Sequence, residues 1–187
     1  MPSPIEKDEG RDKRNMRIRK IEKDKKQYLP LLLLGDEQEE MIDRYLDRGV
    51  LYVLEEEGAG DVAECVVTDE GDGILEIKNI AVAPAFQGKG YGRKLIDFLV
   101  GTYYGKYSVL QAGTGDSPLT VPFYESCGFR RSHVVKHFFL DHYDHPIYEG
   151  GVQLVDMVYF RRPLSGDRSR GAAEDKSTLS ARFNGQS

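Results

Sequence analysis

The clearest chemistry in this sequence lies in one glycine-rich run, Gln87-Gly88-Lys89-Gly90-Tyr91-Gly92-Arg93. A Val-x-Pro step at residues 82–84 precedes it, and apolar residues at helical spacing follow it. Such a junction of strand, loop and helix points unpaired backbone N–H groups and the positive end of a helix dipole at one spot. Glycines let an anion approach the backbone closely, and Lys89 and Arg93 add positive charge. The run therefore predicts a binding site for a pyrophosphate.

Three kinds of phosphate-binding loop have glycine spacings close to this one. The P-loop requires Gly-x-x-x-x-Gly-Lys-Ser/Thr, which the sequence does not contain. The dinucleotide fingerprint Gly-x-Gly-x-x-Gly fails because Arg93 occupies the place of the third glycine, and several expected strands come before the loop. The remaining pattern, Gln/Arg-x-x-Gly-x-Gly/Ala after a Val-x-Pro step, is met at Gln87, Gly90 and Gly92. A glycine-rich turn that only reverses the chain is disfavoured by the step and by the helix that follows.

The third pattern resembles the acetyl-CoA loop of the GNAT superfamily of N-acetyltransferases. A second run, Phe-Tyr-x-x-x-Gly-Phe at residues 123–129, is similar to the C-terminal element of the same superfamily, with Gly128 closing a short helix. The resemblance covers roughly residues 16–160 and is greatest to small bacterial-type members whose acceptors are largely undefined. It implies an acetyl-CoA-dependent N-acetyltransferase, in which a primary amine attacks the acetyl donor directly within a ternary complex.

The resemblance also implies roles for individual residues. Glu76 stands where the superfamily often places a carboxylate that deprotonates the amine, directly or through water. Tyr124 is similar to the residue that donates its proton to the sulfur of CoA. Backbone groups of Ile80, Ala81 and Val82 would bind the pantetheine arm as an added strand would. The loop residues implied in binding acetyl-CoA are Gln87, Gly88, Lys89, Gly90, Tyr91, Gly92 and Arg93.

Deprotonation of the amine is the larger chemical demand in such a reaction. At pH 7 a lysine-like amine with a pKa near 10.4 is almost wholly protonated, and freeing its lone pair costs about 4–5 kcal/mol. For a thiolate leaving group with a pKa near 8.5, the protonated and ionised forms differ in free energy by only about 2 kcal/mol at pH 7. A base is therefore needed more than an acid. Two plainer interpretations stay open: Glu76 as a strand residue paired with a lysine, and Tyr124 as an aromatic packed on a short helix.

Two other functions are compatible with these motifs: a non-catalytic acyl-CoA-binding regulatory module, and an acetyltransferase for protein amines. The presence of both Glu76 and Tyr124 favours the enzyme, since a binding module needs neither. Carboxylates within residues 36–40 and 141–149 should border the acceptor groove, which favours a small cationic acceptor, polyamine-like or aminosugar-like. A solvated helix face is the alternative account of the first group.

Composition narrows the class of protein. The chain has 187 residues, of which 40% are hydrophobic, and a formal net charge of -5, so no overall basic surface favours nucleic acid. Its longest apolar runs, residues 29–34 and 80–86, are too short to span a membrane. The charged start of the sequence has no secretory apolar region, so we expect the cytoplasm and free thiols at Cys65 and Cys127. We expect no metal site, because the histidines match no ligand spacing, and a homodimer is left open.

These residues need a scaffold that holds a strand, a loop and a helix in succession. Residues 1–15 and 165–187 contain few large apolar side chains, so we expect both to be disordered around a single N-acetyltransferase domain at residues 16–164. Sequence patterns predict strands at residues 17–21, 50–55, 62–68, 74–82, 107–112, 129–139 and 152–160. They predict a helix at residues 24–34 with a break at Pro30, and a second helix that is capped by Asp36 and ends at Gly49. Two more helices are predicted at residues 90–104 and 118–126. This order predicts an α/β (α+β) fold with a mixed, mostly antiparallel sheet and helices on both faces; the resemblance adds a splayed central strand pair.

Overall fold

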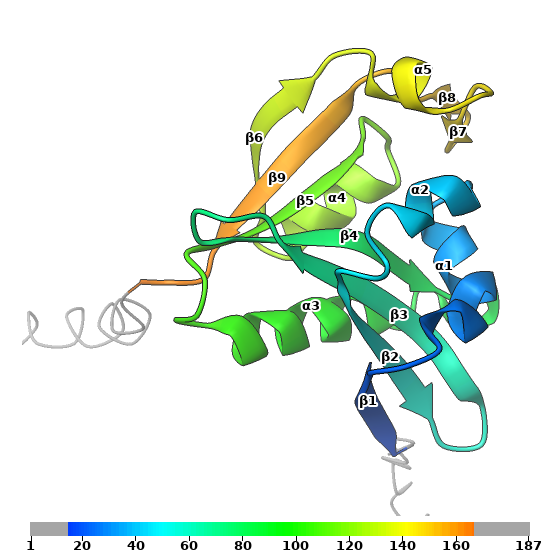
Figure 1. The fold of residues 1–187 in the computed structure, drawn as a ribbon, viewed down its shortest axis with the longest axis vertical. Helices are drawn as coiled ribbons and strands as arrows, with labels where there is room; N and C mark the ends of the chain where they lie inside the picture. Colours follow the sequence, from blue (N-terminus) through cyan, green and yellow to red (C-terminus); the bar gives the residue numbers. More distant parts are fainter. Residues whose placement is uncertain (1–14, 167–187) are drawn as a thin grey trace, which may run out of the picture.

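The computed structural model describes residues 15–166 and places a large sheet between two layers of helices (Figure 1). In chain order the strands are β1 (Met16–Ile21), β2 (Val50–Glu56), β3 (Gly60–Asp69), β4 (Ile74–Val82), β5 (Val109–Gly115), β6 (Arg130–Val135), β7 (Tyr148–Glu149), β8 (Val152–Gln153) and β9 (Met157–Pro163). The helices are α1 (Leu29–Gly35), α2 (Glu39–Asp43), α3 (Tyr91–Tyr103), α4 (Thr120–Ser126) and α5 (Phe138–His142), with 3-10 turns η1 (Lys25–Tyr28) and η2 (Pro84–Phe86). The segments predicted to be disordered lie almost entirely outside the described residues.

The large sheet has seven strands in the order β1-β2-β3-β4-β5-β9-β6, and β7 and β8 form a separate hairpin. Every neighbouring pair in the large sheet is antiparallel except β4 and β5, which run parallel. This confirms the mixed, mostly antiparallel sheet that the sequence predicts. Among the helices of residues 15–166, none is long and apolar enough to cross a membrane.

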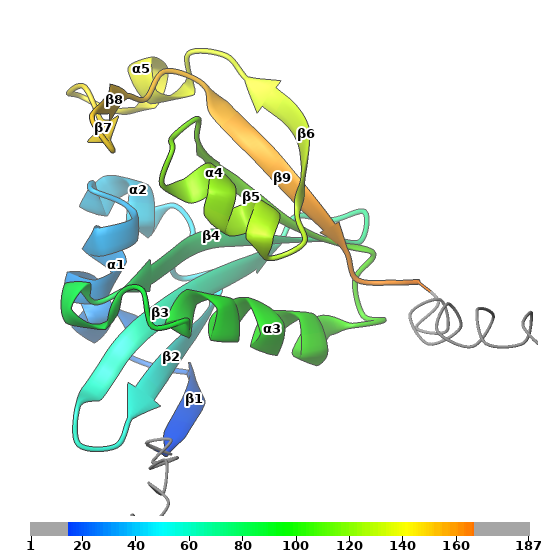
Figure 2. The same cartoon turned by 180° about the vertical axis from the view of Figure 1, so that it is seen from behind.

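The two faces of the sheet are covered by different helices, as Figure 2 shows from behind. Along β2, Leu51 and Val53 belong to a buried cluster with residues of α1 and α2, whereas Tyr52 and Leu54 belong to a cluster with residues of α3 and α4. Alternate strand residues point to opposite faces, so a strand covered on both sides reads as an unbroken apolar run. The helices on both faces that the sequence predicts are confirmed.

The first helical region agrees with the sequence prediction at one point and differs at another. Pro30 lies in the first turn of α1 and separates it from η1, as predicted, because proline lacks the N–H that a continuous helix would use. Asp36 does not cap α2, since it follows α1 in an extended conformation and α2 begins after Gln38. That prediction was wrong because the Asp36 carboxylate accepts a hydrogen bond at 3.0 Å from Tyr143, which is remote in sequence.

The strands predicted at residues 129–139 and 152–160 are both wrong in extent. β6 is shorter than predicted, residues 138–142 form α5, and residues 152–160 divide into β8 and the start of β9. His137 takes a left-handed conformation with φ 57°, and its N–H donates to Asp156 Oδ1 at 2.9 Å. This contact turns the chain away from the sheet, and an alternating sequence pattern cannot reveal it.

The central strands β4 and β5 pair only over their first residues. Their parallel register runs from Ile74↔Val109 to Ile77↔Ala112, after which both strands continue without pairing to each other. Just beyond the last pair, β4 bulges at Lys78, which has no opposite residue in the register with β3. The splayed strand pair that the resemblance implies is therefore confirmed.

A fully buried carboxyl group lies on β3. Glu64 has no exposed surface, and neither of its carboxyl oxygens has a hydrogen-bond partner among the described residues. Val66, two residues further along the strand, belongs to the apolar cluster that packs against α1 and α2. Burial raises the pKa of Glu64 well above its ordinary value of 4.5, so the fold favours the neutral acid.

We expect Glu64→Gln to raise the free energy of unfolding at neutral pH. The pKa of Glu64 is higher in the folded state than in the unfolded state, so the wild type loses stability as the pH rises above 4.5, and a glutamine does not. Urea denaturation at about pH 4 and about pH 8 measures the difference, and each kcal/mol gained corresponds to a rise in Tm of about 2–4 °C.

The control for this prediction is Glu55→Gln on the neighbouring strand β2. The hydrogen bond from Arg17 lowers the pKa of Glu55, so that substitution should remove stability at the higher pH. A Glu64→Gln gain of the same size at both pH values would contradict the account of Glu64 as a buried acid held neutral.

Candidate active site

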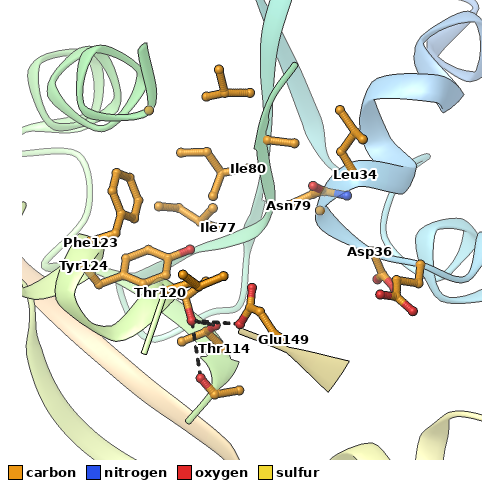
Figure 3. A pocket seen from close by; sticks show the side chains of 18 of the residues that line it. Leu34, Asp36, Ile77, Asn79, Ile80, Thr114, Thr120, Phe123, Tyr124 and Glu149 are labelled. Atoms are coloured by element: carbon orange, nitrogen blue, oxygen red, sulfur yellow. Dashed lines mark hydrogen bonds between the residues drawn. The ribbon is translucent and has the colours of Figure 1, made fainter. Parts of the chain in front are cut away.

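A cavity of about 670 Å³ opens where β4 and β5 part. The end of α1, the unpaired half of β4, the glycine-rich loop, the end of β5, α4 and the β7–β8 hairpin all contribute lining residues. Figure 3 shows the side chains of Tyr124 and Thr120 entering it from one side and those of Leu34 and Asp36 from the other, with Glu149 reaching from β7 to Thr120. The fold thus brings together the loop and Tyr124, which the sequence predicts as parts of one site.

The glycine-rich loop starts helix α3. Gly88 and Gly90 have positive φ angles of 73° and 85°, which residues with a Cβ rarely adopt. Gly90 is the N-cap of α3, and its carbonyl accepts a hydrogen bond from the Lys94 N–H at 3.0 Å. The N–H groups of the first helical turn are left to face the loop, as an anion site requires. A Cβ added at Gly90 would meet no atom within 4 Å, so the space in front of it is open.

Two polar side chains of the loop have partners inside the protein. Arg93 donates to the carbonyl of Ser126 at 2.8 Å, which ties the start of α3 to the end of α4. Gln87 Nε2 donates to the carbonyl of Val82 at 3.0 Å, which ties the loop to the end of β4. Both side chains therefore hold the loop in place, and Arg93 also brings its positive charge to the cavity.

Lys89 points away from the cavity, whereas Tyr91 and Gly92 line it and also pack against the rest of the protein. Lys89 does not line the cavity, and its ammonium lies 5.0 Å from the centre of the Phe86 ring. Tyr91 is buried, and its hydroxyl donates to the carboxylate of Glu56 on β2. Gly92 packs closely on α4, since a Cβ added there would lie 3.1 Å from the Phe123 ring. These contacts belong to the scaffold of the loop.

One edge of β4 presents backbone groups to the cavity. Ala83 N–H donates to the Val62 carbonyl of β3 at 2.8 Å, and residues of an antiparallel strand alternate in the direction of their backbone groups. The N–H and C=O groups of Ile80 and Val82 therefore point away from β3, and those of Ala81 point toward it. An extended chain with amide groups fits this free edge as an added strand.

Tyr124 is held in the wall of the cavity by other aromatic rings. Its ring is stacked on Phe160 with centroids 5.8 Å apart, and it meets Phe123 and Phe129 edge-on. Burial raises the pKa of its hydroxyl well above the ordinary value of 10.0. Tyr124 therefore keeps its proton at neutral pH, and the surrounding rings hold it in a fixed position.

Glu76 lies outside the main cavity, in the paired part of β4. Its carboxylate accepts hydrogen bonds from Lys78 Nζ at 2.9 Å and from Gln111 Nε2 at 2.7 Å. Gln111 in turn accepts from Arg161 Nε at 2.7 Å. Glu76 lines a neighbouring cavity of about 230 Å³. The structure thus gives Glu76 the lysine partner of its plainer interpretation and does not bring it together with Tyr124; its role as the base stays a prediction.

Three carboxylates line the main cavity: Asp36, Glu37 and Glu149. Asp36 is largely buried, which raises its pKa above the ordinary value of 3.8 although Tyr143 donates a hydrogen bond to it. Glu149 Oε2 accepts a hydrogen bond from Thr120 Oγ1 at 3.3 Å (Figure 3). The other carboxylates predicted for the acceptor groove do not line this cavity: Glu39, Glu40, Asp141 and Asp144.

Sequence reasoning missed two hydroxyl groups at this site. Thr114 Oγ1 donates to Thr120 Oγ1 at 2.9 Å, and Thr120 lies beside Glu149. Thr120 precedes Tyr124 by four residues, so helical spacing could have placed both side chains on one face of α4. Thr114 follows the predicted end of its strand, and no local pattern marks it as functional.

A third missed residue, Asn79, fastens α1 to β4. Its Nδ2 donates to the Leu32 carbonyl at 2.8 Å and to the Tyr45 hydroxyl at 2.9 Å. A carbonyl can only accept, so this contact fixes the direction of the amide and turns Oδ1 toward Gly35. A Cβ added at Gly35 would lie 2.0 Å from that oxygen. The contact therefore sets the position of the end of α1, where Asp36 enters the cavity.

Comparison with known proteins decides the family. Residues 47–131 match the family model described as an acetyltransferase (GNAT) domain. The chain is 35% identical over 147 residues to the uncharacterized N-acetyltransferase YvbK of Bacillus subtilis (strain 168), a match that covers 93% of that protein and 76% of this one. The chain belongs to the GNAT superfamily of acetyltransferases. It is an acetyl-CoA-dependent N-acetyltransferase, as the sequence predicts.

Solved structures of GNAT acetyltransferases agree with this assignment. A GNAT family acetyltransferase from Elizabethkingia anophelis, determined with acetyl-CoA bound, has a TM-score of 0.75 and 34% identity, covering 80% of this chain and 98% of that one. An IAA acetyltransferase from Bacillus cereus has a TM-score of 0.73 and 35% identity, covering 79% of this chain and 99% of that one. Acetyl-CoA is the acetyl donor of this protein, as the sequence analysis predicts.

We expect Gly90→Ala to weaken acetyl-CoA binding by about tenfold or more, equivalent to about 1.4 kcal/mol. The added methyl group would strain the left-handed turn and enter the space left for the phosphates. Calorimetry with acetyl-CoA measures the Kd. Gly105→Ala is the matched control, because Gly105 has φ 75° and equally open surroundings but lies beyond the far end of α3. Equal Kd values for the two variants would contradict the placement of the pyrophosphate.

Proposed function

We propose that the protein acetylates a primary amine that carries a positive charge next to an apolar body. The observation that carries this proposal is the single cavity lined by the glycine-rich loop, by Tyr124 and by three carboxylates, Asp36, Glu37 and Glu149. A donor on the loop and a cationic acceptor beside the carboxylates would meet inside it. Direct attack in a ternary complex requires this proximity.

The donor half of the cavity suits acetyl-CoA. The start of α3 and the open turn at Gly90 would receive the pyrophosphate, with Arg93 beside it. The free edge of β4 at Ile80 and Val82 would receive the amides of the pantetheine arm. The thioester would then lie near Tyr124, whose hydroxyl lines the cavity and would give its proton to the sulfur as the C–S bond breaks.

The acceptor half of the cavity is apolar as well as acidic. Leu34, Leu119 and Tyr148 line it and keep 48%, 62% and 60% of their surface exposed. Apolar side chains left exposed around a pocket favour a ligand with an apolar body, and the carboxylates favour a cation. Together they favour an alkylamine or arylamine over the polyamine or aminosugar that the sequence alone suggests.

Glu76 could act as the base only through intervening water. Its carboxylate is held by Lys78 and Gln111 and faces the neighbouring cavity. A general base must reach the proton that it removes directly or through one water. A carboxylate of the main cavity is better placed for direct contact with the amine.

Tyr124→Phe should lower kcat by about 100-fold while leaving the Kd for acetyl-CoA unchanged, because the hydroxyl matters only as the sulfur leaves. Release of free CoA thiol measures kcat, and calorimetry measures the Kd. Tyr107→Phe is the control, since the Tyr107 hydroxyl donates to Asp69 away from the cavity. A Tyr124→Phe enzyme with the kcat of the wild type would remove Tyr124 from the reaction.

A panel of amines tests the acceptor class. With saturating acetyl-CoA, we expect kcat/KM to be highest for 2-phenylethylamine, lower for spermidine and lowest for glucosamine. Salt screens exposed charges, so kcat/KM for the best amine should be lower at high ionic strength than at low ionic strength, by roughly several-fold. A preference for glucosamine would contradict the apolar part of the proposal, and turnover insensitive to salt would contradict its electrostatic part.

A further inference from the structure

Glu149 on β7 faces the wall of the cavity that holds Tyr124 (Figure 3). Its charge is among the causes that raise the pKa of Tyr124, after burial and the effect of Cys127, so the two side chains lie within electrostatic reach. Glu76 is paired with an ammonium group, whereas Glu149 accepts a hydrogen bond from a neutral hydroxyl. The charge of Glu149 is therefore available to a cation in the cavity.

A short chain of hydroxyl groups orients the Glu149 carboxylate. Thr114 Oγ1 donates to Thr120 Oγ1 at 2.9 Å, and the Thr120 hydroxyl lies 3.3 Å from Glu149 Oε2 and 3.4 Å from the Gly115 carbonyl. Because Thr114 supplies a proton to Thr120, the proton of Thr120 is left for one of these two acceptors. When Thr120 donates to Glu149, the shorter of the two contacts, it holds one carboxylate oxygen and leaves the other for a ligand.

The β7–β8 hairpin that carries Glu149 is held at several points. Its turn consists of Gly150 and Gly151, with φ angles of 58° and 77°. A Cβ added at Gly150 would lie 3.1 Å from Pro118 and 3.2 Å from Leu119, so the turn packs directly on the start of α4. At its base, the Leu154 N–H donates to the Ile147 carbonyl at 2.8 Å. The hairpin and α4 thus place Glu149 and Tyr124 as one unit.

The other ionisable groups around the cavity differ from Glu149 in their partners or their exposure. Those that face it from the elements near Glu149 are Asp36, Glu37, Lys78, Tyr124, Tyr143 and Tyr148. Asp36 accepts a hydrogen bond from Tyr143, and Lys78 is paired with Glu76. Glu37 is exposed and lies 3.7 Å from His145. Glu149 is left as the carboxylate on the same side of the cavity as Tyr124.

We propose that Glu149 binds the acceptor ammonium and removes its first proton. The proposal rests on the proposed function, since it requires an amine in this cavity. It gives the two demands of the reaction to neighbouring residues: Glu149 supplies the base and Tyr124 supplies the acid. It also explains why the hairpin packs so closely on α4.

The proton and electron balance of this step is complete. Glu149 takes one proton from R–NH3+ and becomes a carboxylic acid, and the freed lone pair forms the N–C bond with the thioester carbonyl. Collapse of the tetrahedral intermediate breaks the C–S bond, and Tyr124 gives its proton to the sulfur. The nitrogen then returns a proton to the Tyr124 oxygen, and Glu149 releases its own to solvent. The products are the N-acetyl amine, CoA thiol and one proton.

The test compares Glu149→Gln with Glu76→Gln in the full chain, using the best amine of the panel and acetyl-CoA. For Glu149→Gln we expect kcat/KM for the amine to fall by about 100-fold, its pH profile to shift to higher pH, and the Kd for acetyl-CoA to stay unchanged. Glu76→Gln should keep the pH profile of the wild type. Glu125→Gln, which removes an exposed charge from α4, is the control for a general loss of negative charge.

The outcomes separate the two proposals. If Glu149→Gln keeps the wild-type KM and pH profile, Glu149 is not the base, whereas the proposed function stands. If Glu76→Gln shows the shifted profile instead, the base is on β4 and the Glu149 proposal is overturned. If the wild type binds acetyl-CoA but acetylates no amine, the proposed function fails and the Glu149 proposal fails with it. Thr120→Val should give an intermediate loss in kcat/KM, because the hydroxyl only orients the carboxylate.

Discussion

The separation of β4 from β5 beyond Ile77 and Ala112 is the constraint on which the rest of the site depends. Backbone N–H and C=O groups in a protein interior must be hydrogen-bonded, and two strands that part leave such groups unpaired. The bulge at Lys78 helps β4 to leave its neighbour while it stays paired with β3. In the proposed function this strand edge receives an extended ligand, and residues of the loop, α3 and α4 line the same cavity.

Charge is distributed along the cavity in a way that suits two ligands of opposite sign. The start of α3 and Arg93 provide positive potential at one end, and Asp36, Glu37 and Glu149 provide negative potential at the other. A protein with a net charge of -5 can hold an anionic donor where Arg93 and the start of α3 provide positive potential locally. Near the point where the strands part, Glu76 and Lys78 form an ion pair, so their opposite charges largely cancel each other.

The sequence was sufficient for features that rest on local chemistry and insufficient for those that rest on distant contacts. The glycines of the loop, the break at Pro30 and the strand before the loop all follow from residue type and spacing. The second partner of Glu76, by contrast, is Gln111 on the neighbouring strand β5, and no spacing within β4 predicts it. The same holds for the β7–β8 hairpin, because its position depends on contact with the start of α4. The family resemblance supplied the splayed pair and the donor, which no residue pattern alone could give.

The contact between Gly35 and Asn79 has a consequence for how this sequence can diverge. With 2.0 Å between the Asn79 oxygen and the place of a Cβ at position 35, no side chain fits at position 35 while Asn79 keeps this orientation. A side chain at position 35 becomes tolerable only if position 79 has already become small, and that step gives up the tie to α1. The two positions therefore form an epistatic pair, and among homologues their identities should vary together rather than one at a time.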